Sequence, residues 1–237
     1  MDKYGLTVDH LYPKDGPLIK QITQKKIRVP DAVIFMEGLL FQNPDWLKLP
    51  FNIPKIWWFL DADILFEQQV EWYKVTNANY ALVKNKRDLV RFKERGIKCE
   101  WSPYRIDSSV FKIHSSRRDI DIGFVGYINK TRANWLESFT KVAKNVHGYG
   151  DGNIKPYKTF NCNIYPEKIH HDEIAKIYSR TKICPHRTGR YEDSGTTAIG
   201  IQGDITWRPF EAMACGAMVL TEPFDSLDDL WVRGKEI

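Results

Sequence analysis

The residues best suited to chemistry lie in one segment near the end of the chain. Positions 208–222 read RPFEAMACGAMVLTE, a pattern that predicts a short helix, a stop at Gly216 and a buried strand. Arg208 and Glu211 lie at the start of this helix. A carboxylate can accept hydrogen bonds from two ribose hydroxyls, and an arginine can donate paired hydrogen bonds to a phosphate. The segment therefore has the chemistry of a nucleotide site.

Two glycine-containing turns are the next candidates. Residues 119–129, DIDIGFVGYIN, predict a strand that runs into a turn at Gly126, with Arg132 and a helix after it. Residues 147–152, HGYGDG, end the following strand in an open loop around Gly150. Glycine allows close approach of backbone to a ligand, and ligands of doubly wound sheets bind outside the carboxyl ends of strands. Each segment is a candidate ligand turn, with an ordinary connection as the alternative.

Histidines and cysteines form no recognisable metal pattern. His170 and His171 are adjacent, and Cys184 lies two residues before His186, but no matching second pair of ligands accompanies them. We therefore predict no metal site. His186 follows a predicted strand at its carboxyl end, with Arg187 beside it, so we expect it to face the bound ligand.

Two acids follow a strand in the first half of the chain. Asp61 and Asp63 end the sequence WWFLDAD. Such a pair after a strand could hold a divalent cation, because hard cations favour carboxylates. Asp61 could instead orient a substrate hydroxyl or act as a general base, and Asp63 could cap the next helix.

The elements that would position these residues alternate along the chain. Runs rich in Val, Ile and aromatic residues predict strands at 32–36, 56–60, 80–83, 99–102, 120–125, 144–148, 182–184 and 217–221. Amphipathic stretches predict helices at 64–75, 86–95, 132–144, 171–180 and 207–215. This alternation is typical of βαβ units with parallel sheets. The polar stretch 103–118 predicts a crossing between two α/β units, and we place the domains at 1–115 and 116–237.

Composition limits the class of protein. The 237 residues are 43% apolar and 27% charged, which excludes a disordered chain, a collagen-like chain and a disulfide miniprotein. We find no apolar run long enough to span a membrane and no apolar signal-peptide core, and the four cysteines are dispersed. We therefore expect a cytoplasmic protein with reduced cysteines.

The positive charge has a simple interpretation. The net charge is +5, and the basic residues between 84 and 95 could meet an anionic partner. A solvated helix face explains the same run, and no nucleic-acid-binding module accompanies it. We expect no nucleic-acid partner. Only four predicted strands precede the crossing, and the chain stops soon after its last strand, so we expect both domains to be incomplete.

The 208–222 block resembles the donor-site signature of group-1-type glycosyltransferases with the GT-B fold, and the spore-maturation-protein (CgeB-like) branch is the closer match. Three further pieces of that branch occur in order, at 123–126, 148–150 and 171–180. The resemblance is strong over 119–236 and looser over 30–112.

The resemblance implies two Rossmann-like domains that face a cleft. Domain 1–115 would hold the acceptor, and domain 116–237 would hold a nucleotide-diphosphate sugar. Glu211 matches the acid that binds the donor ribose, and the turn from Gly126 to Arg132 would lie near the diphosphate. Many relatives have a second Glu eight positions before the first, where this chain has Gly203 beside Asp204.

The expected activity is metal-independent transfer of a sugar to a glycan, protein or small-molecule acceptor, with no cofactor beyond the donor itself. Without a metal, cationic groups must stabilise the leaving diphosphate. The expected site residues are Asp61 as the catalytic residue and, for the donor, Gly126, Arg132, Gly150, His186, Arg208 and Glu211. Two alternatives stay open: a metal-dependent GT-A enzyme that uses Asp61 and Asp63, and a degenerate nucleotide-binding module without catalysis.

Overall fold

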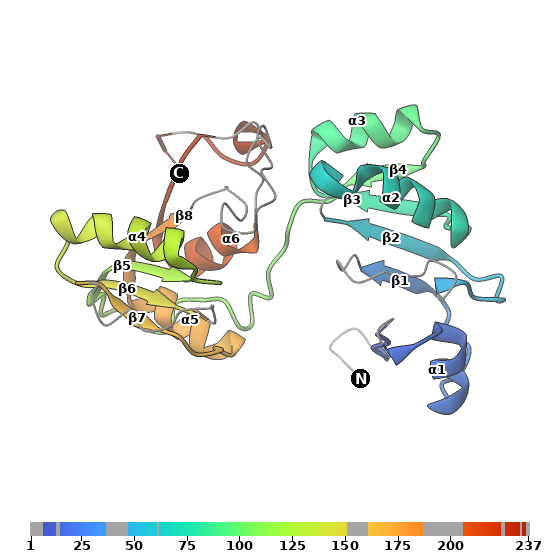
Figure 1. Ribbon diagram of the computed structural model, residues 1–237, viewed down its shortest axis with the longest axis horizontal. Helices are drawn as coiled ribbons and strands as arrows, with labels where there is room; N and C mark the ends of the chain where they lie inside the picture. The colour runs from blue at the N-terminus through green and yellow to red at the C-terminus, as the bar shows by residue number, and fades with distance from the viewer. Residues whose placement is uncertain are drawn as a thin grey trace. The chain divides into compact units, whose positions relative to one another are not determined.

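The protein has an α/β fold with two parallel sheets, as the alternation of elements predicts (Figure 1). The computed structural model describes residues 7–12, 15–36, 47–60, 62–150, 161–186, 206–223, 226–232 and 234–235. The chain divides into two compact units, 1–103 and 104–237, and each contains one sheet. In these described ranges, no helix combines the length and the apolar character that a bilayer crossing requires.

The first unit is built on a four-stranded parallel sheet whose strands follow one another in chain order. Its strands are β1 (Val33–Met36), β2 (Lys55–Phe59), β3 (Tyr80–Val83) and β4 (Cys99–Trp101). Its helices are α1 (Leu18–Gln24), α2 (Ala62–Val75) and α3 (Lys86–Glu94). Helix α2 links β2 to β3, and α3 links β3 to β4, as expected of consecutive βαβ units.

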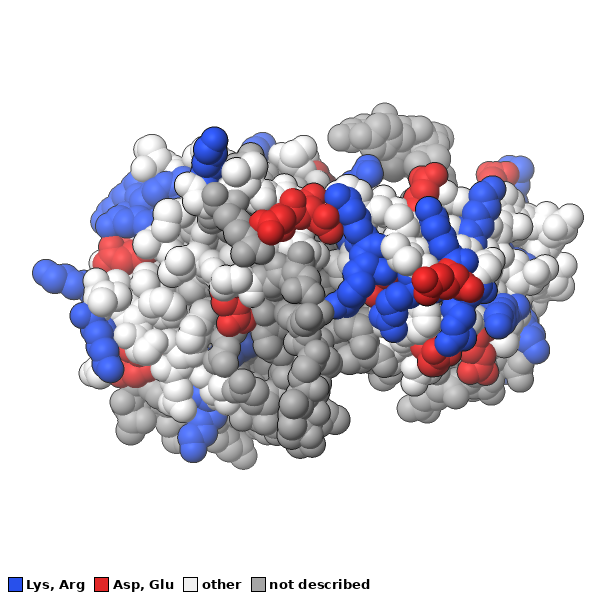
Figure 2. All heavy atoms as spheres, turned by 90° about the horizontal axis from the view of Figure 1, so that it is seen from above, with Lys and Arg blue, Asp and Glu red and all other residues white. Residues whose placement is uncertain are grey.

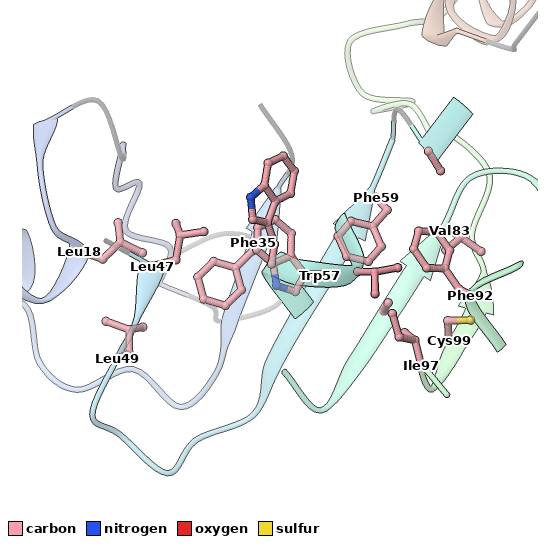
Figure 3. Close-up of a cluster of buried hydrophobic side chains, with 14 of the residues drawn as sticks. Leu18, Phe35, Leu47, Leu49, Trp57, Phe59, Val83, Phe92, Ile97 and Cys99 are labelled. Atoms are coloured by element: carbon pink, nitrogen blue, oxygen red, sulfur yellow. The ribbon is translucent and has the colours of Figure 1, made fainter. Parts of the chain in front are cut away.

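Aromatic side chains fill the core of this unit (Figure 3). The ring of Trp57 stacks between Phe35 and Phe59, at centroid distances of 4.9 and 5.3 Å. Phe59 stacks in turn on Phe92 of α3, at 5.0 Å. The indole N–H of Trp57 donates a hydrogen bond of 2.9 Å to the Thr76 hydroxyl, so its polar atom is satisfied inside the core.

The second unit has five parallel strands in the order β7-β6-β5-β8-β9. They are β5 (Ile120–Val125), β6 (Val146–Tyr149), β7 (Asn163–Tyr165), β8 (Thr181–His186) and β9 (Met218–Thr221). Numbered along the chain within this unit, the order is 3-2-1-4-5. This is the order found in Rossmann-type nucleotide-binding sheets.

Helices cover both faces of the second sheet (Figure 1). They are α4 (Lys130–Ser138), α5 (His171–Arg180) and α6 (Trp207–Ala214), with short 3-10 turns η3 (Phe139–Lys141) and η5 (Leu227–Asp229). On one face, Leu136 of α4 packs with Ile122 of β5. On the other face, residues of α5 and α6 pack with Val125 of the same strand. Because successive residues of a strand face opposite sides of the sheet, β5 contributes side chains to both cores.

The compact units divide at residue 103, twelve residues before the boundary that the sequence suggested. Phe111 is buried in the core of the second unit, and the Ser179 hydroxyl both donates to the Lys112 carbonyl oxygen and accepts from the His114 N–H. The segment 104–115 therefore packs with the second unit.

The sequence did not predict α1 or β7. Strand β7 has only three residues and begins with an asparagine, so it offers no alternating pattern. The helix expected at 132–144 begins and ends earlier as α4, and the chain tightens into η3 after Ser138.

Candidate donor site

The strand order of the second unit changes direction between β5 and β8. β5 pairs with β6 on one side and with β8 on the other, so the connections leave this point toward opposite edges. In open parallel sheets, ligands bind outside the carboxyl ends of the strands at such a switch point. Gly126 follows β5 and His186 ends β8, so both lie at this edge of the sheet.

Two glycines and one arginine meet at this edge. A Cβ atom added to Gly126 would lie 2.6 Å from Nε of Arg208, and one added to Gly150 would collide with the carbonyl oxygen of Gly126. Both glycines have positive φ, 155° for Gly126 and 138° for Gly150. The Gly126 N–H donates to the Tyr149 carbonyl oxygen at 2.8 Å. Only glycine fits these two close approaches, so three predicted site residues are brought together.

Arg208 is fixed at the carboxyl end of β5. Its Nε–H donates a hydrogen bond to the Val125 carbonyl oxygen. The arginine occupies the first turn of α6, whose N-cap Thr206 has extended backbone geometry and makes no side-chain cap. Pro209 follows without a backbone N–H, which the first turn of a helix tolerates. The start of α6 thus places a cation and unpaired helix N–H groups at the switch point.

Glu211 lies one turn into α6 and is half-buried. Its carboxylate has no hydrogen bond or ion pair within the part of the chain that the structure describes. Burial raises the pKa of Glu211, while the positive charges of Arg208 and His171 oppose that rise. A partly desolvated carboxylate without a protein partner is a ready acceptor for ligand hydroxyls.

His186 is 5% exposed and forms two hydrogen bonds to threonines. Its Nδ1 lies 3.1 Å from the Thr221 hydroxyl, and its Nε2 lies 3.2 Å from the Thr206 hydroxyl. Burial, together with the positive charges of Arg208 and Arg132, lowers its pKa to about 4, against the opposing effect of Glu222. The imidazole is therefore neutral at pH 7, and it ties the N-cap of α6 to the ends of β8 and β9.

The start of α4 is largely satisfied by its own chain. The Asn129 side chain accepts from the Arg132 N–H at 2.9 Å and so caps the start of α4. The Arg132 guanidinium donates to the Tyr127 carbonyl oxygen at 2.6 Å and lies 5.7 Å above the Phe124 ring. Arg132 thus borders the Gly126 turn, close enough to influence His186.

A pocket of about 360 Å³ adjoins His186. It is lined by Trp135, Phe139, Pro185, His186, Leu220, Thr221 and Glu222. One wall comes from α4 and η3, and the other from the ends of β8 and β9. The sequence did not predict this pocket, because the spacing of Trp135 and Phe139 is also that of ordinary core residues on an amphipathic helix.

Several residues named from the sequence lie outside the described part. Asp61, Arg187, Gly203 and Asp204 are among them, and so is the side chain of Asp63. Within the described ranges, no group of three or more His, Cys, Asp or Glu residues is arranged to hold a metal ion. The proposed roles of Asp61 and Asp63 stay predictions.

The basic run of the first unit is already engaged by neighbouring groups. On the face that carries α3, basic and acidic side chains are interleaved (Figure 2). Arg91 pairs with Asp88 at 2.9 Å and lies over the Phe66 ring, and Arg95 pairs with Glu67. This arrangement agrees with a solvated helix face.

Comparison with known protein families gives a match within the second unit. Residues 130–237 match a family model described as glycosyl transferase-like. The match spans just under half of the chain and includes α4, β8, α6 and β9. It supports glycosyl transfer as the general activity of this region. No curated protein sequence matched the chain.

The glycosyl transferase-like region contains five of the six predicted donor residues that surround the switch point, and Gly126 lies just before it. Sequence reasoning missed Thr206, Thr221 and Trp135. Thr206 directly precedes the predicted helix and Thr221 ends the predicted strand 217–221, so their positions at element ends were the available signal.

Proposed function

We propose that this protein is a metal-independent glycosyltransferase of the GT-B type, similar to the CgeB-like branch, which uses a nucleotide-diphosphate sugar as donor. The donor binds at the switch point of the second unit. The first unit binds the acceptor, which is a glycan, a protein or a small molecule. We further infer that the enzyme acts in the cytoplasm.

The Glu211 carboxylate is the observation that carries this proposal. It is half-buried, it has no protein partner among the described residues, and it stands beside Arg208. Hydrogen bonds from two ribose hydroxyls would satisfy it and offset the cost of its desolvation. The family match to residues 130–237 supports the same assignment.

The diphosphate would lie over the Gly126 turn. Gly126 lets the Arg208 guanidinium approach this turn closely, and Arg208 and Arg132 supply positive charge there. The first N–H groups of α6 add the positive end of a helix dipole. As the bond to the sugar breaks, negative charge accumulates on the leaving diphosphate, and these groups stabilise it without a metal ion.

His186 would position this machinery. Its two ring nitrogens are engaged by Thr206 and Thr221, so it fixes the start of α6 relative to β9. Asp61, which follows β2 by two residues in the sequence, would activate the acceptor hydroxyl as a general base.

The test is donor turnover with a panel of UDP-, GDP-, ADP- and dTDP-glucose, with and without EDTA. We expect release of nucleoside diphosphate from one donor, unchanged by EDTA and lost in Glu211→Gln. Loss of turnover with EDTA, together with its loss in Asp61→Asn and Asp63→Asn, would instead support the metal-dependent GT-A alternative. Binding of a donor without any turnover would support the non-catalytic module.

A further inference from the structure

The pocket beside His186 differs from a phosphate site in its chemistry. Its aromatic wall consists of Trp135 and Phe139, whose rings meet edge to face at 5.4 Å. Its polar rim consists of Thr221 and Glu222, and no lysine or arginine lines it among the described residues. His186, the remaining polar group, is neutral at pH 7. This lining repels anions and suits an uncharged, hydroxylated ring.

Trp135 offers two kinds of contact to such a ring. Its indole N–H has no hydrogen-bond partner in the portion of the chain that the structure describes, and its side chain is only partly buried. The flat apolar face of an aromatic ring packs well against the C–H groups of a pyranose, and the free N–H can donate to a hydroxyl. The volume of about 360 Å³ lies at the low end of ligand pockets, roughly 300–1,000 Å³.

The order of charged groups along this edge identifies which part of the donor would reach the pocket. Arg208 donates to the Val125 carbonyl oxygen at the end of β5, His186 ends the adjacent strand β8, and Glu222 follows β9 on the far side of β8. Glu211 lies three residues after Arg208 on α6. Along this edge the groups therefore run from Arg208, with Glu211 behind it on α6, through His186 to Glu222. A nucleotide sugar has the order base, ribose, diphosphate, sugar. With ribose at Glu211 and diphosphate at Arg208, the next group toward the pocket is the sugar.

We propose that the pocket between Trp135 and Glu222 holds the transferred sugar of the donor, a neutral hexose. This inference rests on the proposed function. Glu222 and Thr221 would accept and donate hydrogen bonds to the sugar hydroxyls, and Trp135 would pack against the ring face. The nucleobase would lie on the other side of Arg208, next to the ribose.

The experiment is calorimetric titration with a nucleoside diphosphate and with its glucose conjugate. The diphosphate is the one of UDP, GDP, ADP and dTDP that binds most tightly. We expect the wild type to bind the conjugate about fivefold or more tightly than the diphosphate, the gain from about one net hydrogen bond plus ring packing. In Trp135→Leu and in Glu222→Gln this ratio should fall toward one, while affinity for the diphosphate stays within about twofold.

Controls separate this inference from the proposed function. Glu94→Gln, an exposed acid on α3 of the first unit, should leave the ratio unchanged. Glu222 is also exposed, so its variant tests the pocket even if Trp135→Leu unfolds. A ratio unchanged in both pocket variants, a ratio of one in the wild type, or an equal loss of diphosphate affinity would overturn the sugar assignment alone. If no diphosphate binds the wild type, the proposed function fails with it.

Discussion

At the scale of single residues, burial decides the chemistry of the two titratable side chains nearest the switch point. Glu211 is half-buried with a raised pKa, and His186 is almost fully buried with a lowered pKa. In both cases the uncharged form is favoured in the folded protein. The acid is thereby poised for a ligand, whereas the histidine serves as a neutral link between threonines.

His186 predicts a loss of stability on acidification. Its folded pKa of about 4 lies below the ordinary value of 6.5, so between these values the unfolded chain binds more protons. The free energy of unfolding should therefore fall as the pH drops from 6.5 to 4, by roughly 3 kcal/mol from this group. Denaturant titrations at several pH values in this range give the free energy of unfolding as a function of pH. This dependence should be weaker in His186→Gln than in the wild type, and unchanged in the exposed His10→Gln.

The half-buried carboxylate of Glu211 should lower the free energy of unfolding at neutral pH. Because its folded pKa is raised, the folded protein holds the proton more tightly, and stability falls as the pH rises through that pKa. At pH 7 the neutral Glu211→Gln should melt no lower than the wild type. A clearly lower melting temperature at pH 7 would indicate that the carboxylate makes stabilising contacts instead.

The position of Arg208 and Glu211 at the start of α6 could be predicted, because Pro209 and Gly216 mark the start and the end of that helix in the sequence. The partners of His186 could not, since Thr206 and Thr221 come from elements far apart in the sequence. The pairing of β8 with β9 brings Thr221 to His186, and the start of α6 brings Thr206 to the same imidazole.

At the scale of elements, two glycine turns allow the strands and α6 to meet. Gly126 leaves the space that the Arg208 guanidinium fills, and Gly150 leaves space for the Gly126 carbonyl. Runs rich in Val, Ile and aromatic residues predicted eight of the nine strands in the described ranges, and seven of those eight have four or more residues. The three-residue β7 lacked that signal, so the full strand order could not be derived.

Substitution of Gly126 should affect both stability and donor binding. Gly126→Ala forces a Cβ to within 2.6 Å of Arg208 Nε at a positive φ, so the arginine must move. We expect a donor affinity at least about tenfold weaker, equivalent to roughly 1.4 kcal/mol. Gly96→Ala is the matched control, because Gly96 also has positive φ (72°) but faces open space. That variant should lose about 1 kcal/mol of stability and keep its donor affinity.

At the scale of the whole molecule, the proposed function divides binding and transfer between two units. Each unit has its own sheet and its own buried core, so a change in one can leave the other folded. The proposed donor residues all belong to the second unit, whereas the proposed base Asp61 belongs to the first. The two-unit organisation followed from the polar crossing in the sequence, but the packing of 104–115 did not, because a single buried Phe111 and the Ser179 hydrogen bonds decide it.

This division predicts a separation of binding from catalysis. Asp61→Asn should leave nucleoside-diphosphate affinity within about twofold and reduce sugar transfer by about 100-fold or more, the usual contribution of a general base. Rates of donor consumption with acceptor present, measured beside calorimetric affinities, would check both parts. An equal loss in affinity and in rate would contradict the assignment of Asp61 to the acceptor side.

The most direct test of the central claim is the affinity of wild type and Glu211→Gln for the same nucleoside diphosphate, measured by calorimetry at pH 7 in EDTA. If Glu211 binds the ribose, the wild type binds the nucleoside diphosphate in EDTA. The variant then binds the same diphosphate about tenfold or more weakly, since a hydrogen bond to a charged group contributes about 1.5–3 kcal/mol. Equal affinities in a folded variant would contradict the claim.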